Sequence, residues 1–132
     1  MSVRDKLAKI LLVEPDDEVR SLLVKNLKFE GYHVFLAIDE ETALARTRDG
    51  CERPDLILLN QVGKTIDEYV QIGIRIRKNA QVSELTPIVV IAEKYGIDLE
   101  GRDIKVSENE YVTYLEDALQ LMNLLKRLCQ RS

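Results

Sequence analysis

Runs of branched aliphatic residues without strict alternation mark four segments of this chain. They read KILLV (9–13), YHVFLA (32–37), DLILL (55–59) and PIVVIA (87–92). Such runs suit strands that are buried on both faces of a parallel sheet. YVTYL (111–115) predicts a shorter fifth strand.

Helical spacing of apolar residues fills the gaps between these strands. Asp16 predicts an N-cap, and a left-handed stop at Gly31 follows apolar positions with helical spacing, namely Val19, Leu22, Leu23 and Leu27. A shorter helix is predicted between Asp39 and Gly50, and a third begins near Asp67 and includes Gly73. From Glu116 a last helix is expected to bury Ala118, Leu119, Met122, Leu125 and Leu128.

The segment 93–110 breaks this pattern. It carries Gly96, Gly101 and dense charge with little periodicity, which predicts a long loop or a frayed helix. The order of elements therefore predicts an α/β fold with three layers, in which helices cover both faces of a five-stranded parallel sheet. A chain of 132 residues forms one domain, 1–132, with its core over 9–128.

Composition narrows the classes of function. A net charge of −4, 5% aromatic residues and no Trp argue against binding to nucleic acid. The chain has no apolar run long enough to span a membrane and no secretory segment, so we expect a cytoplasmic protein. Cys51 and Cys129 are expected to be free thiols, and the single histidine, His33, forms neither a zinc site nor a catalytic triad by itself.

The third apolar run ends in an amide. PDLILLN (54–60) reaches the carboxyl end of the predicted sheet, where ligands bind in open α/β folds, but its last residue is Asn60. This run resembles the third strand of the receiver domain of response regulators, the phosphoacceptor module of two-component signalling. ILLVEPDDEVRSLLVKNLKFEGYHVFLAIDEETAL, TPIVVIA and ENEYVTYLEDALQLMNLLKRL resemble other parts of the same family, so the resemblance extends from about Lys9 to Leu128. It implies the flavodoxin-like (CheY-like) fold, here with an irregular or missing fourth helix.

The resemblance also shows what has been lost from the phosphorylation site. Receivers use a nucleophilic aspartate, an acidic pair that helps it to bind a divalent cation, a hydroxyl and a lysine. Glu14 keeps the first acidic position, whereas the other positions hold Pro15, Asn60, Ala92 and Tyr114. An amide is a poor nucleophile and a weak ligand for a hard cation, so the pattern predicts a pseudo-receiver with no catalytic residues and no bound cofactor.

Two features of this predicted site leave alternatives open. Asp16 and Asp17 could supply displaced ligands to Mg²⁺, although Asp16 suits the helix cap better. Tyr111 stands where receivers carry an aromatic residue that swings inward on activation. Here it either rests inward permanently beside Ala92 or covers the edge of the sheet.

Three hypotheses for function follow. The first is a stand-alone receiver, not an enzyme, that signals through phosphorylation-independent binding of a protein partner at the face formed by 93–128, or through a homodimer. Because no output domain follows within the 132 residues, output is expected from a partner, a dimer or a domain outside this sequence. The second is a phosphorelay receiver that accepts phosphate at a non-standard carboxylate such as Asp16 or Asp17. The third is a small-molecule sensor that uses the vestigial pocket.

Overall fold

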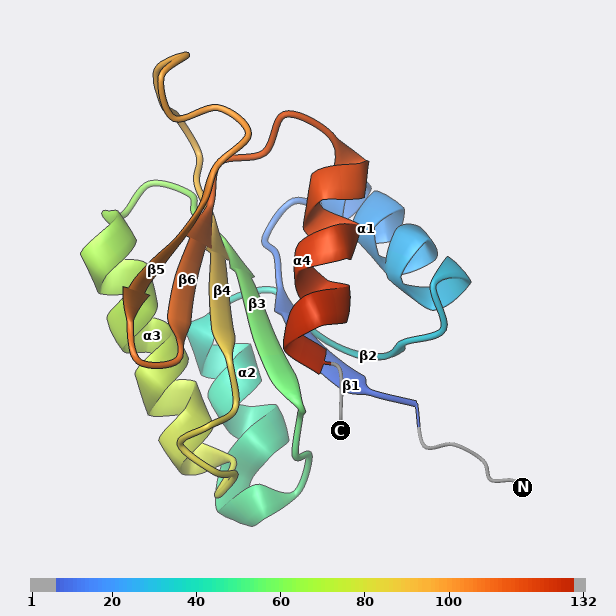
Figure 1. Cartoon of the computed structure of the whole chain (residues 1–132). Coiled ribbons are helices and arrows are strands. Elements are labelled where there is room, and N and C mark those ends of the chain that lie inside the picture. Colours follow the sequence, from blue (N-terminus) through green and yellow to red (C-terminus); the bar gives the residue numbers. More distant parts are fainter. Residues whose placement is uncertain (1–6, 130–132) are drawn as a thin grey trace.

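A computed structural model describes residues 7–129 as one sheet with helices on both faces (Figure 1). The sheet has six strands in the order β2-β1-β3-β4-β6-β5. Their bounds are β1 Lys9–Val13, β2 His33–Ala37, β3 Leu56–Asn60, β4 Ile88–Ile91, β5 Asp103–Ser107 and β6 Glu110–Thr113. All neighbours pair in parallel except β5 and β6, which are antiparallel.

Two helices cover each face of the sheet. They are α1 Asp17–Phe29, α2 Glu40–Thr47, α3 Ile66–Asn79 and α4 Ala118–Cys129, and a short 3₁₀ turn, Arg48–Gly50, follows α2. Helices α1 and α4 lie on one face, and α2 and α3 lie on the other (Figure 1). Within residues 7–129, no helix combines the length and the apolar character that crossing a membrane requires.

The core consists of two apolar clusters, one on each side of the sheet. Alternate residues of β1 contribute to both, since Leu11 belongs to the cluster under α2 and α3 while Ile10 and Leu12 belong to the cluster under α1 and α4. All three are fully buried. This two-sided burial explains why the strands of the sequence read as unbroken apolar runs.

Local signals in the sequence set several helix ends. The carboxylates of Asp16 and Asp39 accept hydrogen bonds from the backbone N–H groups of Val19 (2.9 Å) and Thr42 (2.8 Å), which confirms the predicted N-cap at Asp16 and shows that Asp39 caps the second helix in the same way. Gly31 has the left-handed backbone that its prediction as a stop requires, with φ of 94°. Within the part of the chain that the structure describes, neither Cys51 nor Cys129 forms a disulfide.

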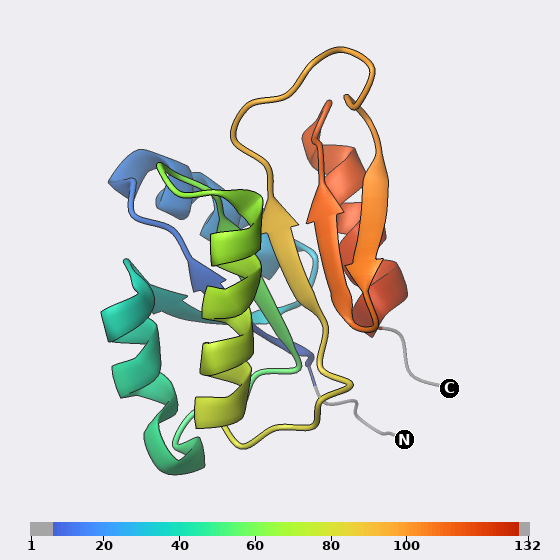
Figure 2. The ribbon, with the colours of Figure 1, turned by 90° about the vertical axis from the view of Figure 1, so that its left-hand side faces the viewer.

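The segment 93–110 differs from the prediction. It has no fourth helix, as foreseen, but its second half forms β5, so the sheet has six strands and not five. Figure 2 shows β5 and β6 as a hairpin at the margin of the sheet. No alternation of apolar and polar residues marks β5 in the sequence, because Lys105, Val106 and Ser107 are all exposed.

The buried side of α4 was also predicted wrongly in part. Ala118 and Leu119 are exposed, Leu119 by 66%, whereas Leu121 and Leu124 are buried. Leu125 is buried as predicted. The helix begins only at Ala118, so Ala118 and Leu119 lie at its exposed start, and its buried leucines lie further along it.

Candidate functional site

The carboxyl ends of β1, β3 and β4 border an open cleft of about 510 Å³. Its lining includes the predicted site residues Glu14, Pro15, Asn60 and Ala92. Parallel pairing of the three strands brings these residues together although they are far apart in the sequence. The structure therefore brings these four predicted site residues together at one cleft, whereas Tyr111 and Tyr114 do not line it.

At the floor of the cleft, Asn60 and Glu14 bind one another. The Asn60 Nδ2 group donates to Glu14 Oε1 at 2.5 Å, and the backbone N–H of Asp16 donates to Glu14 Oε2 at 3.1 Å. Glu14 is completely buried. Both carboxylate oxygens of Glu14 thus accept hydrogen bonds from the protein. One donor is Asn60, which stands where receivers carry the nucleophilic aspartate.

The residues present do not fit a magnesium ion. Pro15 has no ligand atom in its side chain, Asp16 caps α1, and Asp17 forms an ion pair with Arg20. Within the described part of the chain, no three or more His, Cys, Asp or Glu side chains lie together in a way that could hold a metal ion. A hard cation requires several oxygen ligands, which this arrangement does not offer.

The end of β4 is tied to the loop that follows β3. Glu93 Oε1 accepts a hydrogen bond from the backbone N–H of Gly63 (3.1 Å), and Gln61 Oε1 accepts one from the backbone N–H of Glu93 (2.8 Å). Gln61 Nε2 in turn donates to the backbone carbonyl of Lys64 at 2.8 Å. These contacts join segments 30 or more positions apart, so the sequence alone does not show that Glu93 faces Gly63.

Ala92 and Tyr114 stand where receivers need a hydroxyl and a cation. Ala92 is 6% exposed and belongs to the core cluster under α2 and α3. Tyr114 packs against the same cluster, with its ring edge-on to that of Tyr95 at 5.4 Å between centroids and 77° between planes. The Tyr95 hydroxyl donates to the backbone carbonyl of Leu115, so this hydrogen bond holds Tyr95 beside the chain that follows β6.

Tyr111 and Tyr114 pack against opposite faces of the sheet. Tyr111 is half-buried and packs against the cluster under α1 and α4. Because β5 extends the sheet beyond β6, Tyr111 does not cover a sheet edge. Its role as a switch residue stays a prediction.

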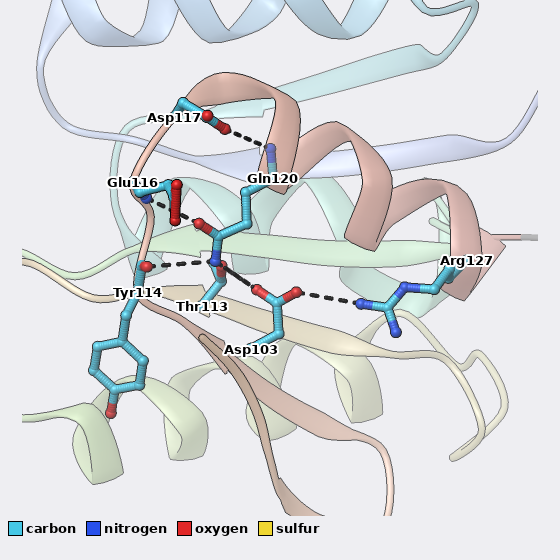
Figure 3. A network of polar contacts seen from close by, with 7 residues as sticks. All are labelled: Asp103, Thr113, Tyr114, Glu116, Asp117, Gln120 and Arg127. Carbon is cyan, nitrogen blue, oxygen red and sulfur yellow. Dashed lines mark hydrogen bonds and ion pairs between the residues drawn. The ribbon is translucent and has the colours of Figure 1, made fainter. Parts of the chain in front are cut away.

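A polar network that the sequence did not reveal links β5, β6 and α4 (Figure 3). Gln120 Nε2 donates to Asp103 Oδ1 (2.9 Å) and to Thr113 Oγ1 (3.2 Å), and Thr113 Oγ1 donates to Asp103 Oδ1 (2.7 Å). Arg127 Nη2 contacts Asp103 Oδ2 at 3.2 Å. The network fixes the additional strand against α4 on the surface formed by 93–128.

Comparison with known proteins supports the receiver resemblance. No family model matches the chain. It is 28% identical to the alkaline phosphatase synthesis transcriptional regulatory protein PhoP of Bacillus subtilis, covering 94% of this chain and 49% of that protein. It is 29% identical to the transcriptional regulatory protein CpxR of Klebsiella pneumoniae, covering 94% and 50% respectively.

A solved structure shows the same fold. A putative response regulator from Chloroflexus aurantiacus superposes with a TM-score of 0.70 at 22% identity, over 96% of this chain and all of that one. The fold is therefore the CheY-like flavodoxin fold, and a receiver domain of two-component signalling is supported. The chain spans about half the length of the curated relatives that it matches.

Proposed function

We propose that this receiver-like domain transmits a signal by binding another protein and that it does so without being phosphorylated. The hydrogen bond from Asn60 to Glu14 carries the proposal, because it joins the position of the nucleophile to the only carboxylate kept from the acidic pair. An amide held in this way has no oxygen that can form an acyl phosphate.

The other contacts around the cleft support the same conclusion. Transfer of a phosphoryl group depends on charges that are positioned to stabilise its oxygens. Ala92 offers no hydroxyl, and Tyr114 places an aromatic ring in the core cluster where a lysine would offer a cation. Glu93 adds a negative charge that would repel phosphate.

The proposed contact surface is the face formed by residues 93–128. It contains the hairpin of β5 and β6 together with α4, and the Gln120 network holds these three elements in one arrangement (Figure 3). A surface that is already ordered loses little conformational entropy on binding, which favours recognition by a folded partner. We propose a cytoplasmic location and no enzymatic activity for the domain. The transcriptional role named for the two relatives belongs to those proteins.

A phosphorelay acceptor at Asp16 or Asp17 is less well supported. Asp16 is bound to the backbone of α1, and Asp17 is paired with Arg20. The cleft itself, at about 510 Å³, is large enough for a small metabolite, which keeps the sensor hypothesis as a second candidate.

Incubation with acetyl phosphate and Mg²⁺, followed by intact mass measurement, tests the proposal directly. We expect an unchanged mass, and no Mg²⁺-dependent rise in melting temperature with beryllofluoride. A receiver that retains its aspartate, treated in parallel, controls for the reagents. Either an added phosphate or a clear magnesium-dependent stabilisation would exclude the proposed mechanism.

A further inference from the structure

Strand β5 forms one edge of the sheet. Among the described residues no strand lies beyond it (Figure 2). Its last three residues are exposed. An edge strand presents unpaired backbone donors and acceptors, and a second strand can use them. What pairs with this edge depends on which groups point outward and which side chains flank them.

The hydrogen bonds of β6 show which residues of β5 point outward. Asp103 lies opposite Thr113, and Lys105 lies opposite Tyr111. The backbone carbonyl of Thr113 accepts from the N–H of Ala92, the residue directly after β4, so the backbone of Thr113 faces β4 and not β5. Bonded and non-bonded pairs alternate along an antiparallel ladder. The backbone groups of Asp103 and Lys105 therefore face away from β6.

Charge then selects one register for a second copy of this strand. In an antiparallel pair centred on Ile104, Asp103 of each copy lies opposite Lys105 of the other, with opposite charges side by side. Centring the pair on Lys105 would oppose two lysines, and centring it on Asp103 would oppose two aspartates. All three registers place outward-facing backbone groups of the two copies opposite each other. Of the three, only the register centred on Ile104 does so without placing like charges opposite each other.

We infer that a second copy of this chain binds at β5, so that the two sheets join into one continuous sheet across a twofold axis at Ile104. A twofold contact of this kind is self-complementary, as closed dimers require. Ile104 is half-exposed in the single chain, and the contact would bury it against its own symmetry mate. Lys105 has no ion-pair partner within residues 7–129, so its charge is available to the second copy.

This inference deepens the proposed function, because β5 belongs to the surface 93–128. The two can nevertheless fail separately. Failure of β5 pairing would appear as a monomer in light scattering and sedimentation. Failure of the proposed mechanism would appear as an added phosphate in the intact mass.

Light scattering and sedimentation on the whole chain over a dilution series test the inference. We expect a reversible dimer that weakens with dilution, since one pair of strands buries less than the ~800 Å² per partner of a standard interface. Lys105→Glu places two acidic residues opposite one another and should abolish the dimer. Lys25→Glu, the same charge change on an exposed part of α1, is the matched control and should leave the dimer intact.

A second variant and a local measurement guard against misfolding and against a dimer formed elsewhere. Lys105→Pro removes an outward N–H group that β6 does not use, so circular dichroism should show a folded monomer. In the wild type, amide exchange at residues 103 and 105 should slow as concentration rises. A monomer at all concentrations, or a dimer that survives both changes at Lys105, would overturn the inference.

Discussion

The side-chain amide of Asn60 donates a hydrogen bond of 2.5 Å to the fully buried carboxylate of Glu14. In a site that handles phosphate, two carboxylates at these positions would share a cation. Here one acid and one amide satisfy each other. The contact gives the buried carboxylate of Glu14 a hydrogen-bond donor inside the protein.

Replacing Asn60 by aspartate should destabilise the protein without restoring phosphorylation. In Asn60→Asp, two carboxyl groups would meet at the distance of the present hydrogen bond, and at neutral pH their repulsion should cost ~1–3 kcal/mol of unfolding free energy. The loss should shrink as the pH falls, because one carboxyl group then becomes protonated. Denaturant melts at several pH values and intact mass after acetyl phosphate treatment measure both effects. Robust labelling of this single variant would contradict the prediction.

The buried ion pair between Arg77 and Glu110 should be the most costly polar contact to break. Arg77 Nη1 lies 2.7 Å from Glu110 Oε2, and the side chains are 11% and 7% exposed. Glu110→Gln leaves the buried charge of Arg77 without its partner, and we expect this to lower the free energy of unfolding by ~3–5 kcal/mol. Replacing both residues together, by Arg77→Met with Glu110→Leu, should cost less than the single change. Equal losses in the two variants would contradict this assignment.

The same pair should make stability depend on pH in acid. Burial opposes ionisation of Glu110, but hydrogen bonds from Ser107 and Arg77 outweigh it and lower its pKa below the usual 4.5. The contribution is therefore present above pH ~4.5 and is lost as the pH falls through the lower folded-state pKa. Denaturant melts from neutral pH into acid should show this loss in the wild type and a weaker one in Glu110→Gln.

Gln120 should hold β5 in place. Its side-chain amide donates to Asp103 and Thr113. Gln120→Leu removes both hydrogen bonds and should lower the free energy of unfolding by ~1–3 kcal/mol. Hydrogen exchange should speed up in β5 more than in β1. Asn123→Leu, on an exposed position of the same helix, is a matched control and should change little. Uniform loosening of the whole sheet would argue against this local role.

Gly73 should resist replacement by alanine even though it lies inside α3. A Cβ there would lie 2.6 Å from Ile88 Cγ2. We expect the energetic cost of this clash to exceed the ~1 kcal/mol that alanine gains over glycine in helix propensity. We expect Gly73→Ala to lower the free energy of unfolding by ~1–3 kcal/mol, because the added methyl group overpacks the core. In an Ile88→Ala background the same change should be neutral or stabilising. Thermal melts of the four proteins in this cycle test the coupling, and strictly additive losses would exclude it.

Much of the fold follows from local patterns in the sequence. Unbroken apolar runs at positions such as 9–13 identify the parallel strands because a strand buried on both faces needs apolar residues throughout. Asp16 and Asp39 mark helix starts because capping depends on residues only three positions apart. The sequence also located Glu14, Pro15, Asn60 and Ala92 at one cleft, since strand ends of a parallel sheet meet at one edge.

Tertiary structure alone decided the parts that depend on distant partners. Strand β5 has few apolar residues, and what stabilises it is pairing with β6 and the network from Gln120, 17 positions away from Asp103. The contact of Glu93 with Gly63 and the ring contact of Tyr114 with Tyr95 likewise join segments that only the folded chain brings together. Apolar periodicity and capping are properties of neighbours in sequence, whereas polar contacts across the sheet depend on geometry that no single segment carries.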